Sequence, residues 1–284
     1  MTSPDKTTSP DKLMQDTLLL QDKIAIVYGG GGAIGGAVAR AFARDGAQVH
    51  LLGRTESKLE AVAGEIRSAG GRAETGVVDV LAETAVDASV EAVVSAVGRL
   101  DVMINAAGFD DGEQGIPLVD LSAAEFGRPI ADYTRSLFVT AQAAARRMKD
   151  QGSGVLLSIS APMARSGTAL TGPFGPAQAA VETMTRQLAG ELGGFGIRAV
   201  CLRPAGMPES AERLGSHVRQ IWSRAAERVG MTLDQMLPLV AGDTMVPGPM
   251  TVGELAEVAA FLASDRARGV TGTVINVSRG AVLD

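Results

Sequence analysis

Short apolar runs alternate with longer amphipathic segments along most of the chain. Seven runs rich in Val, Ile and Leu have the length of buried strands: residues 23–29, 47–53, 73–80, 100–108, 154–160, 197–204 and 272–278. Helical spacing of apolar residues marks six segments between or after these runs: 33–46, 55–71, 84–97, 123–149, 174–192 and 252–264. This alternation predicts an α/β fold, with a parallel sheet covered by helices on both faces.

Two segments depart from the alternation. Residues 1–20 are polar, contain proline and repeat Thr-Ser-Pro-Asp-Lys, which predicts a disordered tail or, as the alternative, a docking peptide. Residues 21–284 then form one domain, because no break in composition indicates a second. Within that domain, residues 206–250 hold five of the 11 methionines and Trp222. This composition is typical of a pliable lid over an apolar ligand, and the alternative is a pair of helices packed on the body.

The composition narrows the class of protein. Of 284 residues, 46% are hydrophobic, only 4% are aromatic and 35 are glycine, so small side chains must fill a large core. A net charge of −6 does not point to nucleic acid or an anionic membrane as a partner. The single cysteine, Cys201, excludes an internal disulfide framework and fits a reducing compartment. No apolar run approaches the ~20 residues of a membrane span and no secretion signal is recognised, so we expect a soluble, cytoplasmic protein.

A glycine-rich loop lies between the first predicted strand and the first predicted helix. Its Gly30-x-Gly32-x-x-Gly35 spacing fits the dinucleotide-binding fingerprint. Glycines let the backbone turn sharply and approach a pyrophosphate, which then rests on the positive end of the helix. The loop therefore predicts nucleotide binding, with a purely structural tight turn as the alternative.

The end of the second predicted strand indicates which nicotinamide nucleotide is preferred. Folds that prefer NAD usually place an acid there, which bonds the ribose 2′-hydroxyl. Here the strand ends in Leu-Leu-Gly-Arg-Thr, so Gly53 offers no carboxylate and Arg54 follows. A guanidinium can clamp a 2′-phosphate. The sequence thus favours NADP(H) over NAD(H), and the alternative is that Arg54 is a solvated residue at a strand end.

Further motifs follow the glycine loop in order: Val-Val-Asp-Val at 77–80, Ile-Asn-Ala-Ala-Gly at 104–108, Leu-Leu-Ser-Ile-Ser-Ala at 156–161 and Leu-Arg-Pro-Ala-Gly at 202–206. With these motifs the chain resembles the short-chain dehydrogenase/reductase family over about residues 20–284. Residues 251–280 are similar to that family's C-terminal helix and last strand. The resemblance implies a single Rossmann-type, doubly wound domain with about seven parallel strands.

The resemblance also implies a set of cofactor-binding residues. Gly29, Ala33 and Gly35 match the family's Thr-Gly-x-x-x-Gly-x-Gly loop. Tyr28 replaces its Thr, and Ala33 replaces its middle glycine. Asp79 matches the acid that contacts the adenine amino group. The whole set implied to bind the cofactor is Gly29, Gly32, Ala33, Ile34, Gly35, Arg54, Asp79, Val80, Asn105, Ala106, Ala107, Gly108, Gln178 and Pro204.

The four positions of the family's catalytic residues are all changed. Alignment of the motifs places Tyr133 at the family's Asn, Ala161 at its Ser, Phe174 at its Tyr and Gln178 at its Lys. An unperturbed tyrosine has a pKa of ~10 and needs a nearby cation to act near neutrality. Loss of such acid–base help typically removes roughly 10²–10⁴ in rate, so ordinary ketone reduction by the family's route is not predicted.

The chain's two tyrosines are candidates for a replacement proton donor. Both Tyr28 and Tyr133 occupy positions that we expect in the site. Tyr133 could act as a relocated acid, with Arg135 or Arg165 as the cation that lowers its pKa. The alternative is that Tyr133 only fills the volume where the family's Asn holds a water.

Three other polar residues are weaker candidates. Ser160 would polarise a substrate if its strand shifted by one residue, but neighbouring residues of a strand point to opposite faces. His50 and His217 are isolated, which is typical of packing or surface residues. Nothing in the sequence has the spacing of metal ligands.

Three functions are compatible with this pattern, and we favour the first because the cofactor motifs persist. It is an NADP(H)-dependent oxidoreductase that transfers hydride to an activated C=C, C=N or carbonyl of an apolar small molecule. The second is a cofactor-binding protein without turnover, such as a sensor or an inactive partner subunit. The third is non-redox isomerisation or cyclisation by shape alone. Family analogy implies a homotetramer or homodimer built on residues 123–149 and 174–192, where Ala177, Ala179 and Ala180 would allow close helix contact.

Overall fold

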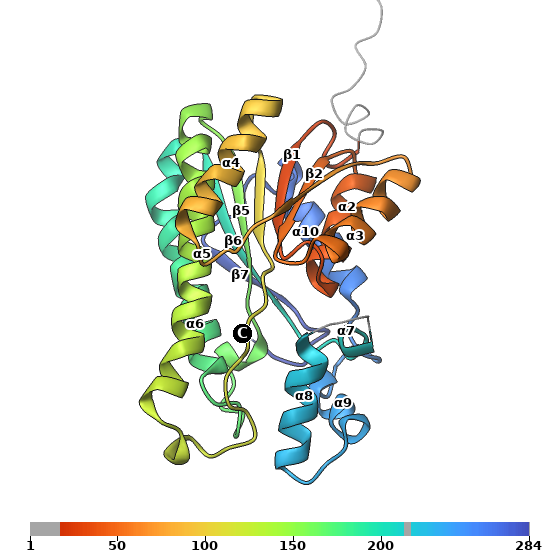
Figure 1. Ribbon diagram of the computed structural model, residues 1–284, viewed down its shortest axis with the longest axis vertical. Coiled ribbons are helices and arrows are strands. Elements are labelled where there is room, and N and C mark those ends of the chain that lie inside the picture. The colour runs from red at the N-terminus through yellow and green to blue at the C-terminus, as the bar shows by residue number, and fades with distance from the viewer. Residues whose placement is uncertain (1–17, 213–216, 284) are drawn as a thin grey trace, which may run out of the picture.

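Seven parallel strands form one sheet at the centre of the molecule, which the computed structural model describes over residues 18–212 and 217–283 (Figure 1). The strands are β1 (Ile24–Tyr28), β2 (Gln48–Gly53), β3 (Arg72–Val77), β4 (Val102–Asn105), β5 (Gly154–Ile159), β6 (Ile197–Pro204) and β7 (Thr273–Val277). Their order in the sheet is β3-β2-β1-β4-β5-β6-β7, with every pairing parallel. The direction of winding reverses between β1 and β4, which confirms the predicted doubly wound, Rossmann-type fold.

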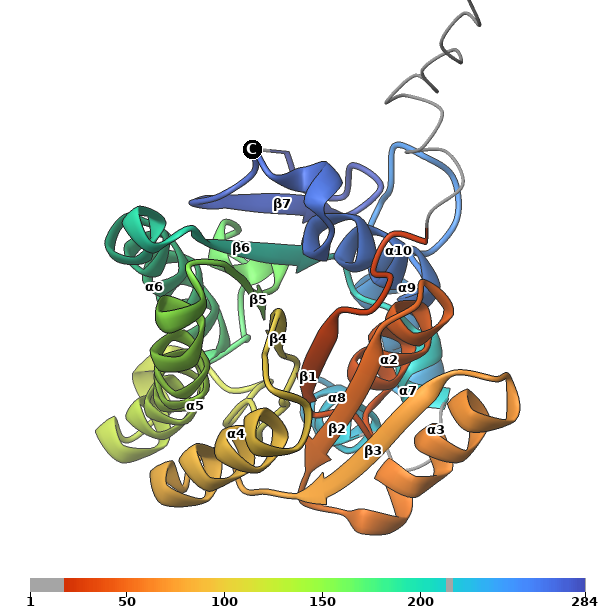
Figure 2. The same cartoon turned by 90° about the horizontal axis from the view of Figure 1, so that it is seen from above.

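Helices cover both faces of this sheet. They are α2 (Ala33–Arg44), α3 (Glu56–Ser68), α4 (Glu83–Val97), α5 (Ala123–Gln151), α6 (Phe174–Leu192) and α10 (Val252–Ala263). Helices α2, α3 and α10 form one layer and α4, α5 and α6 the other, each over its own hydrophobic core (Figure 2). Each predicted strand and helix is present, with ends that differ by a few residues. Within residues 18–212 and 217–283, no helix combines the length and apolar character that a bilayer crossing requires.

Tyr28 lies in the core between β1 and α4, away from the predicted site. Strand alternation puts Val27 in the core under α2 and sends Tyr28 into the opposite core. The Tyr28 ring is fully buried, and its hydroxyl lies 3.3 Å from the Ser89 hydroxyl of α4. Burial raises the pKa of Tyr28 to about 12. The prediction that Tyr28 belongs to the site is therefore wrong, because its side chain leaves the strand toward the helix layer.

The predicted tail, residues 1–20, falls mostly outside the described residues, which begin at Leu18. Leu18 is exposed, but Leu20 is fully buried in the core. The Leu20 N–H also donates to the Asp45 carbonyl oxygen over 2.8 Å. Leu20 thus already belongs to the packed body of the domain.

The methionine-rich segment forms a helical subdomain near the carboxyl ends of the strands (Figure 1). It contains α7 (Glu209–Glu212), α8 (His217–Arg228) and α9 (Leu233–Ala241), while residues 213–216 lie outside the described residues. A capping box between Thr232 and Gln235 fixes the start of α9. The segment is therefore a set of packed helices, and its inner side chains also line the cavity described next.

Candidate active site

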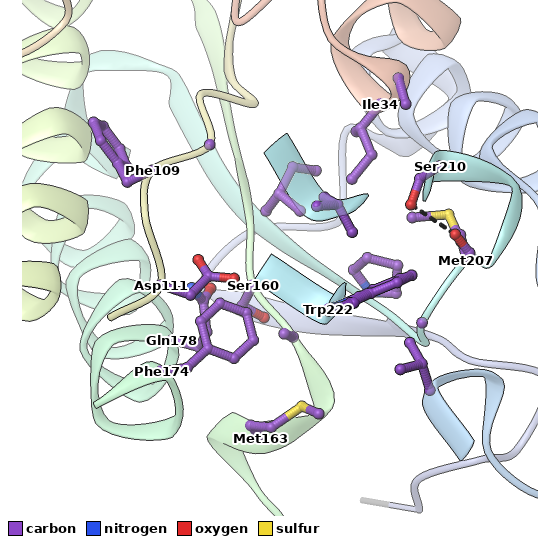
Figure 3. A pocket seen from close by; sticks show the side chains of 18 of the residues that line it. Ile34, Phe109, Asp111, Ser160, Met163, Phe174, Gln178, Met207, Ser210 and Trp222 are labelled. Atoms are coloured by element: carbon purple, nitrogen blue, oxygen red, sulfur yellow. Dashed lines mark hydrogen bonds between the residues drawn. The ribbon is translucent and has the colours of Figure 1, made fainter. Parts of the chain in front are cut away.

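A cavity of about 770 Å³ opens at the carboxyl ends of the strands, where doubly wound sheets bind ligands (Figure 3). One wall comes from the β1–α2 loop and the end of β2, and a second from the β4–α5 loop, α5 and α6. Helices α8 and α9 of the methionine-rich segment complete it. The cavity thus joins the region of the predicted cofactor residues to the region of the predicted catalytic residues.

The glycine loop has a backbone shape that side chains would prevent. Gly29 has a φ of +77°, and a Cβ there would lie 2.4 Å from the Ala106 carbonyl oxygen. A Cβ on Gly35 would lie 2.2 Å from the Gly29 carbonyl oxygen, so α2 can approach the loop only through a glycine. Gly32 begins α2 without a side-chain cap, and the first turn of the helix has no acid. The first N–H groups of α2 therefore suit a phosphate, and these residues fit a dinucleotide.

Most of the predicted cofactor residues line the cavity: Gly29, Gly32, Ala33, Ile34, Arg54, Val80, Asn105, Ala106, Ala107, Gly108, Gln178 and Pro204. Gly35 and Asp79 do not line it. Gly35 lies beneath the loop, where its role is close packing. Asp79 is exposed, and its carboxylate accepts a hydrogen bond from the Leu81 N–H over 3.0 Å.

Positive charge lies where β2 meets the cavity. Arg54 follows the last residue of β2, is exposed, and forms no ion pair with another residue of the described ranges. Lys58, in the first turn of α3, lines the same end of the cavity. Gly53 leaves this position without a carboxylate. This end of the cavity therefore suits an anionic group.

Asn105 holds the turn after β4 against α5. Its buried amide donates to the hydroxyls of Ser136 over 2.8 Å and Thr140 over 2.9 Å. Its Oδ1 accepts from the Ala107 N–H over 3.1 Å. These bonds fix the Asn105–Gly108 turn, whose backbone forms part of the cavity wall.

The four residues that the sequence motifs align with the catalytic positions come together in the cavity. Tyr133 is on α5, Ala161 follows β5, and Phe174 and Gln178 are one turn apart on α6, and all four line the cavity. The rings of Tyr133 and Phe174 lie edge to face with centroids 6.2 Å apart. Phe109 packs against the other side of Tyr133 at 5.1 Å. A tyrosine and two phenyl rings thus occupy the wall between α5, α6 and the β4–α5 loop.

Asp111 is a site residue that the sequence analysis missed. Its carboxyl is buried, with 7% of the residue exposed, and it lines the cavity beside Gln178 and Phe174 (Figure 3). The Tyr133 hydroxyl donates to Asp111 Oδ1 over 2.6 Å. Burial raises the pKa of Asp111 to about 7, although the hydrogen bond from Tyr133 lowers it. The only sequence signal was an Asp-Asp pair after the Asn-Ala-Ala-Gly motif, which does not show which acid points inward.

Tyr133 has an acidic partner rather than the cation that a relocated acid would need. Burial, and then the charge of Asp111, raise the pKa of Tyr133 well above its usual value, although a hydrogen bond with the Gln178 side chain lowers it. Arg135 is exposed and donates to the Leu81 carbonyl oxygen over 3.0 Å. Arg165 is exposed and lines a second, separate hollow. Neither arginine supplies the cation that would lower the pKa of Tyr133.

Ser160 is buried at the cavity wall but is already hydrogen-bonded. Its hydroxyl donates to Glu182 Oε1 over 3.0 Å. Glu182 also forms a buried ion pair with Arg203, with N–O distances of 2.7 and 2.9 Å. The serine thus ties β5 to an ion pair between α6 and β6. The neighbouring Ser158 hydroxyl pairs with Thr185 over 2.7 Å.

Of the two histidines, His50 lies outside this arrangement, and the His217 side chain lies outside the described residues. His50 is buried in β2, and burial lowers its pKa. His217 begins α8. Among the described residues, no group of three or more His, Cys, Asp or Glu side chains could hold a metal ion.

The methionine-rich segment gives the cavity its apolar side. Its lining residues include Met207, Val218, Trp222, Met231, Met236 and Leu239. Met245 is exposed and Met250 is buried in the core, so these two do not line the cavity. Trp222 stands opposite Asp111, Gln178 and Phe174 (Figure 3). Helices α8 and α9 therefore pack with apolar residues toward the cavity, and a pliable lid over a ligand stays a prediction.

Comparison with known proteins agrees with this architecture. Residues 31–282 match the family model described as enoyl-(acyl carrier protein) reductase. The chain is 30% identical to the short-chain reductase protein NovJ of Streptomyces niveus, over 90% of this chain and 93% of that protein. It is 30% identical to the (2S)-[(R)-hydroxy(phenyl)methyl]succinyl-CoA dehydrogenase subunit BbsD of Thauera aromatica, over 92% and 97%.

A solved structure shares the whole fold. NAD⁺-bound xylitol dehydrogenase superposes with a TM-score of 0.83 at 25% identity, covering 92% of this chain and 99% of that one. The matching family model, the named reductases and dehydrogenases, and the seven-stranded sheet all identify the same group of oxidoreductases. The chain therefore belongs to the short-chain dehydrogenase/reductase family.

Proposed function

We propose that this protein is an NADP(H)-dependent oxidoreductase whose active site works without the family's Tyr/Lys pair. Its substrate would be an apolar small molecule with an activated C=C, C=N or carbonyl group. The observation that carries the proposal is one cavity in which the glycine loop, with its close contacts at Gly29 and Gly35, meets Phe174 and Gln178. The loop keeps the features that receive a dinucleotide, whereas Phe174 has no proton to give.

The cofactor part of the proposal depends on two regions. The glycine loop and the uncapped start of α2 would hold the pyrophosphate. Arg54 and Lys58 would meet a 2′-phosphate, which NADP(H) carries and NAD(H) lacks. When bound, NADP(H) supplies the hydride. Asn105–Gly108 and Gln178 would form the wall beside its nicotinamide half.

The catalytic part follows from what the side chains can donate. Phe174 and Gln178 cannot form the Tyr–cation pair that protonates a ketone oxygen. Acceptors that need little acid help, such as enones or iminium ions, remain suitable. The description of the matching family model, an enoyl reductase, supports C=C reduction as one option. Tyr133, held by Asp111, and Ser160, held by Glu182, are hydroxyls of the cavity wall that could meet a bound substrate on this proposal.

The lining supports an apolar substrate. Phe109, Phe174 and Trp222 enclose the space with methionines of the helical segment. The cavity of about 770 Å³ includes the region of the predicted cofactor residues, so a substrate would occupy only its apolar part. A substrate of this kind would gain affinity from burial of its apolar surface.

The experiment that tests this function separates binding from turnover. NADPH and NADH are titrated by calorimetry, and NADPH absorbance is then followed with enones, cyclic imines and ketones. We expect NADPH to bind more tightly and to be consumed with an enone or imine, at a rate roughly 10²–10⁴ above that with ketones. Consumption of neither nucleotide with any acceptor would contradict the proposal.

A substitution at Arg54 tests the cofactor preference. Arg54→Ala should weaken NADPH binding by about tenfold or more, which corresponds to about 1.4 kcal/mol, and leave NADH binding within about twofold because NADH has no 2′-phosphate. Arg72→Ala is the matched control, because Arg72 is exposed and lies outside the cavity. Equal effects of Arg54→Ala on both nucleotides would remove the argument for NADP(H).

A second candidate is an inactive subunit that binds the cofactor for a partner. The same Phe174 and Gln178 favour it, and one relative, BbsD, is named as a subunit of a dehydrogenase. Tight NADPH binding without consumption, together with activity in a complex with a second chain, would support it. If neither nucleotide binds, the non-redox alternative, isomerisation or cyclisation by cavity shape, becomes the working hypothesis.

A further inference from the structure

The Asp111 carboxyl lacks the cation that a buried acid normally has. Its Oδ1 accepts from Tyr133, and no second hydrogen bond to this carboxyl forms among residues 18–212 and 217–283. The residue is 7% exposed and its carboxyl forms part of the cavity wall (Figure 3). A carboxylate taken out of water is costly unless it is paired. The Asp111 carboxylate therefore lacks a positively charged partner, and such a partner would have to lie inside the cavity.

The cations of the neighbourhood are committed to other acids. Arg224 of α8 pairs with Asp110 over 2.9 Å. Arg128 of α5 lies 3.5 Å from the same Asp110 carboxylate and 3.8 Å from Asp132.

One further ion pair lies on this side of the molecule. Arg228 pairs with Glu113, and it also donates to the Gln114 carbonyl oxygen over 2.8 Å. Asp110 raises the pKa of Asp111 and Arg224 lowers it, but burial has the largest effect. No protein cation within the described ranges therefore makes an ion pair with Asp111.

The surroundings of Asp111 suit an organic cation. Tyr133 is in direct contact through its hydroxyl, and Phe109 and Phe174 flank the tyrosine ring. Trp222 faces this wall from the other side of the cavity (Figure 3). Aromatic faces attract cations, most strongly where water is excluded. A carboxyl among aromatic rings thus offers charge and cation–π contacts to a ligand that is otherwise apolar.

We propose that Asp111 is a recognition site for the positively charged nitrogen of an apolar ligand, either a protonated amine or an iminium ion. The nitrogen would pair with the carboxylate, and the apolar body would lie against Trp222 and the methionines. Applied to the reaction, the cation site narrows the proposed acceptors to those with a C=N group. This part of the proposal rests on the proposed function. The binding itself requires no nucleotide, so it can be tested alone.

The test uses two probes of the same shape that differ in one atom. Phenyltrimethylammonium carries a permanent positive charge, and tert-butylbenzene has carbon in place of its nitrogen. The chain has one tryptophan, Trp222, and it lines this cavity, so its fluorescence reports occupancy. At pH 8 we expect the ammonium ion to bind at least tenfold more tightly than its neutral isostere. The charge of the probe does not change with pH. The preference for the ammonium ion over its neutral isostere should therefore fall between pH 8 and 5, because Asp111 takes up a proton.

Two variants assign the effect to one carboxyl. Asp111→Asn keeps the shape and can still accept from Tyr133, but it should bind the two probes within about twofold of each other. Asp110→Asn, at the neighbouring exposed acid, should keep the tenfold preference. Circular dichroism confirms that each variant is folded. Equal binding of both probes to the unmodified protein, or a preference that survives Asp111→Asn, would overturn the proposal.

The result is independent of the nicotinamide nucleotide. If the ammonium probe is preferred but NADPH does not bind, the cation site stands and the proposed function fails. If NADPH binds and is consumed with enones but the probes bind equally, the proposed function stands and the cation site fails. The two proposals can therefore be judged separately.

Discussion

Among single residues, Asp111 should make the stability of the protein depend on pH. Burial raises its pKa from 3.8 to about 7. Between about pH 4 and pH 7 the folded protein therefore holds a proton that the unfolded chain releases, so this group lowers the free energy of unfolding as pH rises through that window. Above pH 7 the loss is complete and amounts to roughly 4 kcal/mol at most, since each pKa unit corresponds to about 1.4 kcal/mol.

Asp111→Asn removes this dependence while keeping the hydrogen bond from Tyr133. We expect the variant to exceed the unmodified protein in free energy of unfolding at pH 8 by roughly 1–4 kcal/mol, and the difference to shrink at pH 5. Urea unfolding at the two pH values measures it. Asp110→Asn should show no such pattern, because that carboxyl is exposed and paired with Arg224. If the free energy of unfolding depends on pH in the same way in Asp111→Asn and in the unmodified protein, a group other than Asp111 causes the dependence.

The motif alignment predicts that Phe174 and Gln178 stand where the family has Tyr and Lys, and this prediction can be tested by substituting those residues. The double variant Phe174→Tyr, Gln178→Lys supplies a phenol and a cation one helical turn apart on α6. We expect it to gain NADPH-dependent reduction of simple ketones by roughly 10²-fold or more. Either single variant should gain much less, because a tyrosine without its cation is too weak an acid to protonate the ketone oxygen efficiently.

The control for this experiment adds the hydroxyl that the alignment predicts at position 161. A triple variant that includes Ala161→Ser tests whether the carbonyl must also be polarised. If the double variant does not reduce ketones and the triple variant does, the lack of a hydroxyl at Ala161 limits the reaction. If both are silent, Tyr133 or the helical segment over the cavity blocks a productive pose for ketones.

At the level of elements, the contact between the glycine loop and α2 depends on Gly35. A Cβ at Gly35 would lie 2.2 Å from the Gly29 carbonyl oxygen, so Gly35→Ala must push the helix away from the loop. We expect the variant to lose about tenfold or more in NADPH affinity and roughly 1–3 kcal/mol in stability. Calorimetry and thermal unfolding measure the two effects.

Gly64→Ala is the matched control on the next helix. Gly64 is also helical, but a Cβ there meets no atom within 4 Å. The change should raise stability by roughly 0.5–1 kcal/mol, since alanine is the better helix former, and leave NADPH affinity unaltered. Similar losses in both variants would mean that close packing at Gly35 is not the cause.

The element pattern could be predicted because each strand and helix shows its own period. Strands buried on both faces, such as β1, appear in the sequence as continuous apolar runs, and the covering helices repeat their apolar residues every three to four positions. The positions at which strands and helices end were harder to predict. The run predicted as strand to residue 108 stops at Asn105, because the Asn105 side chain bonds the turn that follows. Side-chain bonds of this kind have no periodicity.

The interior of the site was harder to predict, because it depends on which way single side chains point. Tyr28 and Tyr133 looked equivalent in sequence, but β1 turns the first into the core and α5 turns the second into the cavity. Asp110 and Asp111 are adjacent, yet the first pairs with Arg224 on the surface and the second is buried. Ala177, expected on an outer face, is fully buried instead. Only three-dimensional packing separates such neighbours.

At the level of the whole molecule, the outer face of α5 supports the expectation of a homodimer or homotetramer. Phe138 is 50% exposed there. One helical turn away, the buried Gln142 Oε1 has no hydrogen-bond partner within the described part of the chain. The exposed aromatic ring of Phe138 favours a surface that a second copy covers.

Light scattering tests this expectation. We expect a mass that is two or four times the 29.1 kDa of one chain. Phe138→Glu should weaken the assembly by tenfold or more, because it places a charge in an apolar contact. Val77→Glu, an equally drastic change at an exposed position on the edge strand β3, should leave the mass unchanged. A monomer in the unmodified protein would contradict the expected assembly. An assembly that is insensitive to Phe138→Glu would mean that the contact between copies is not on α5.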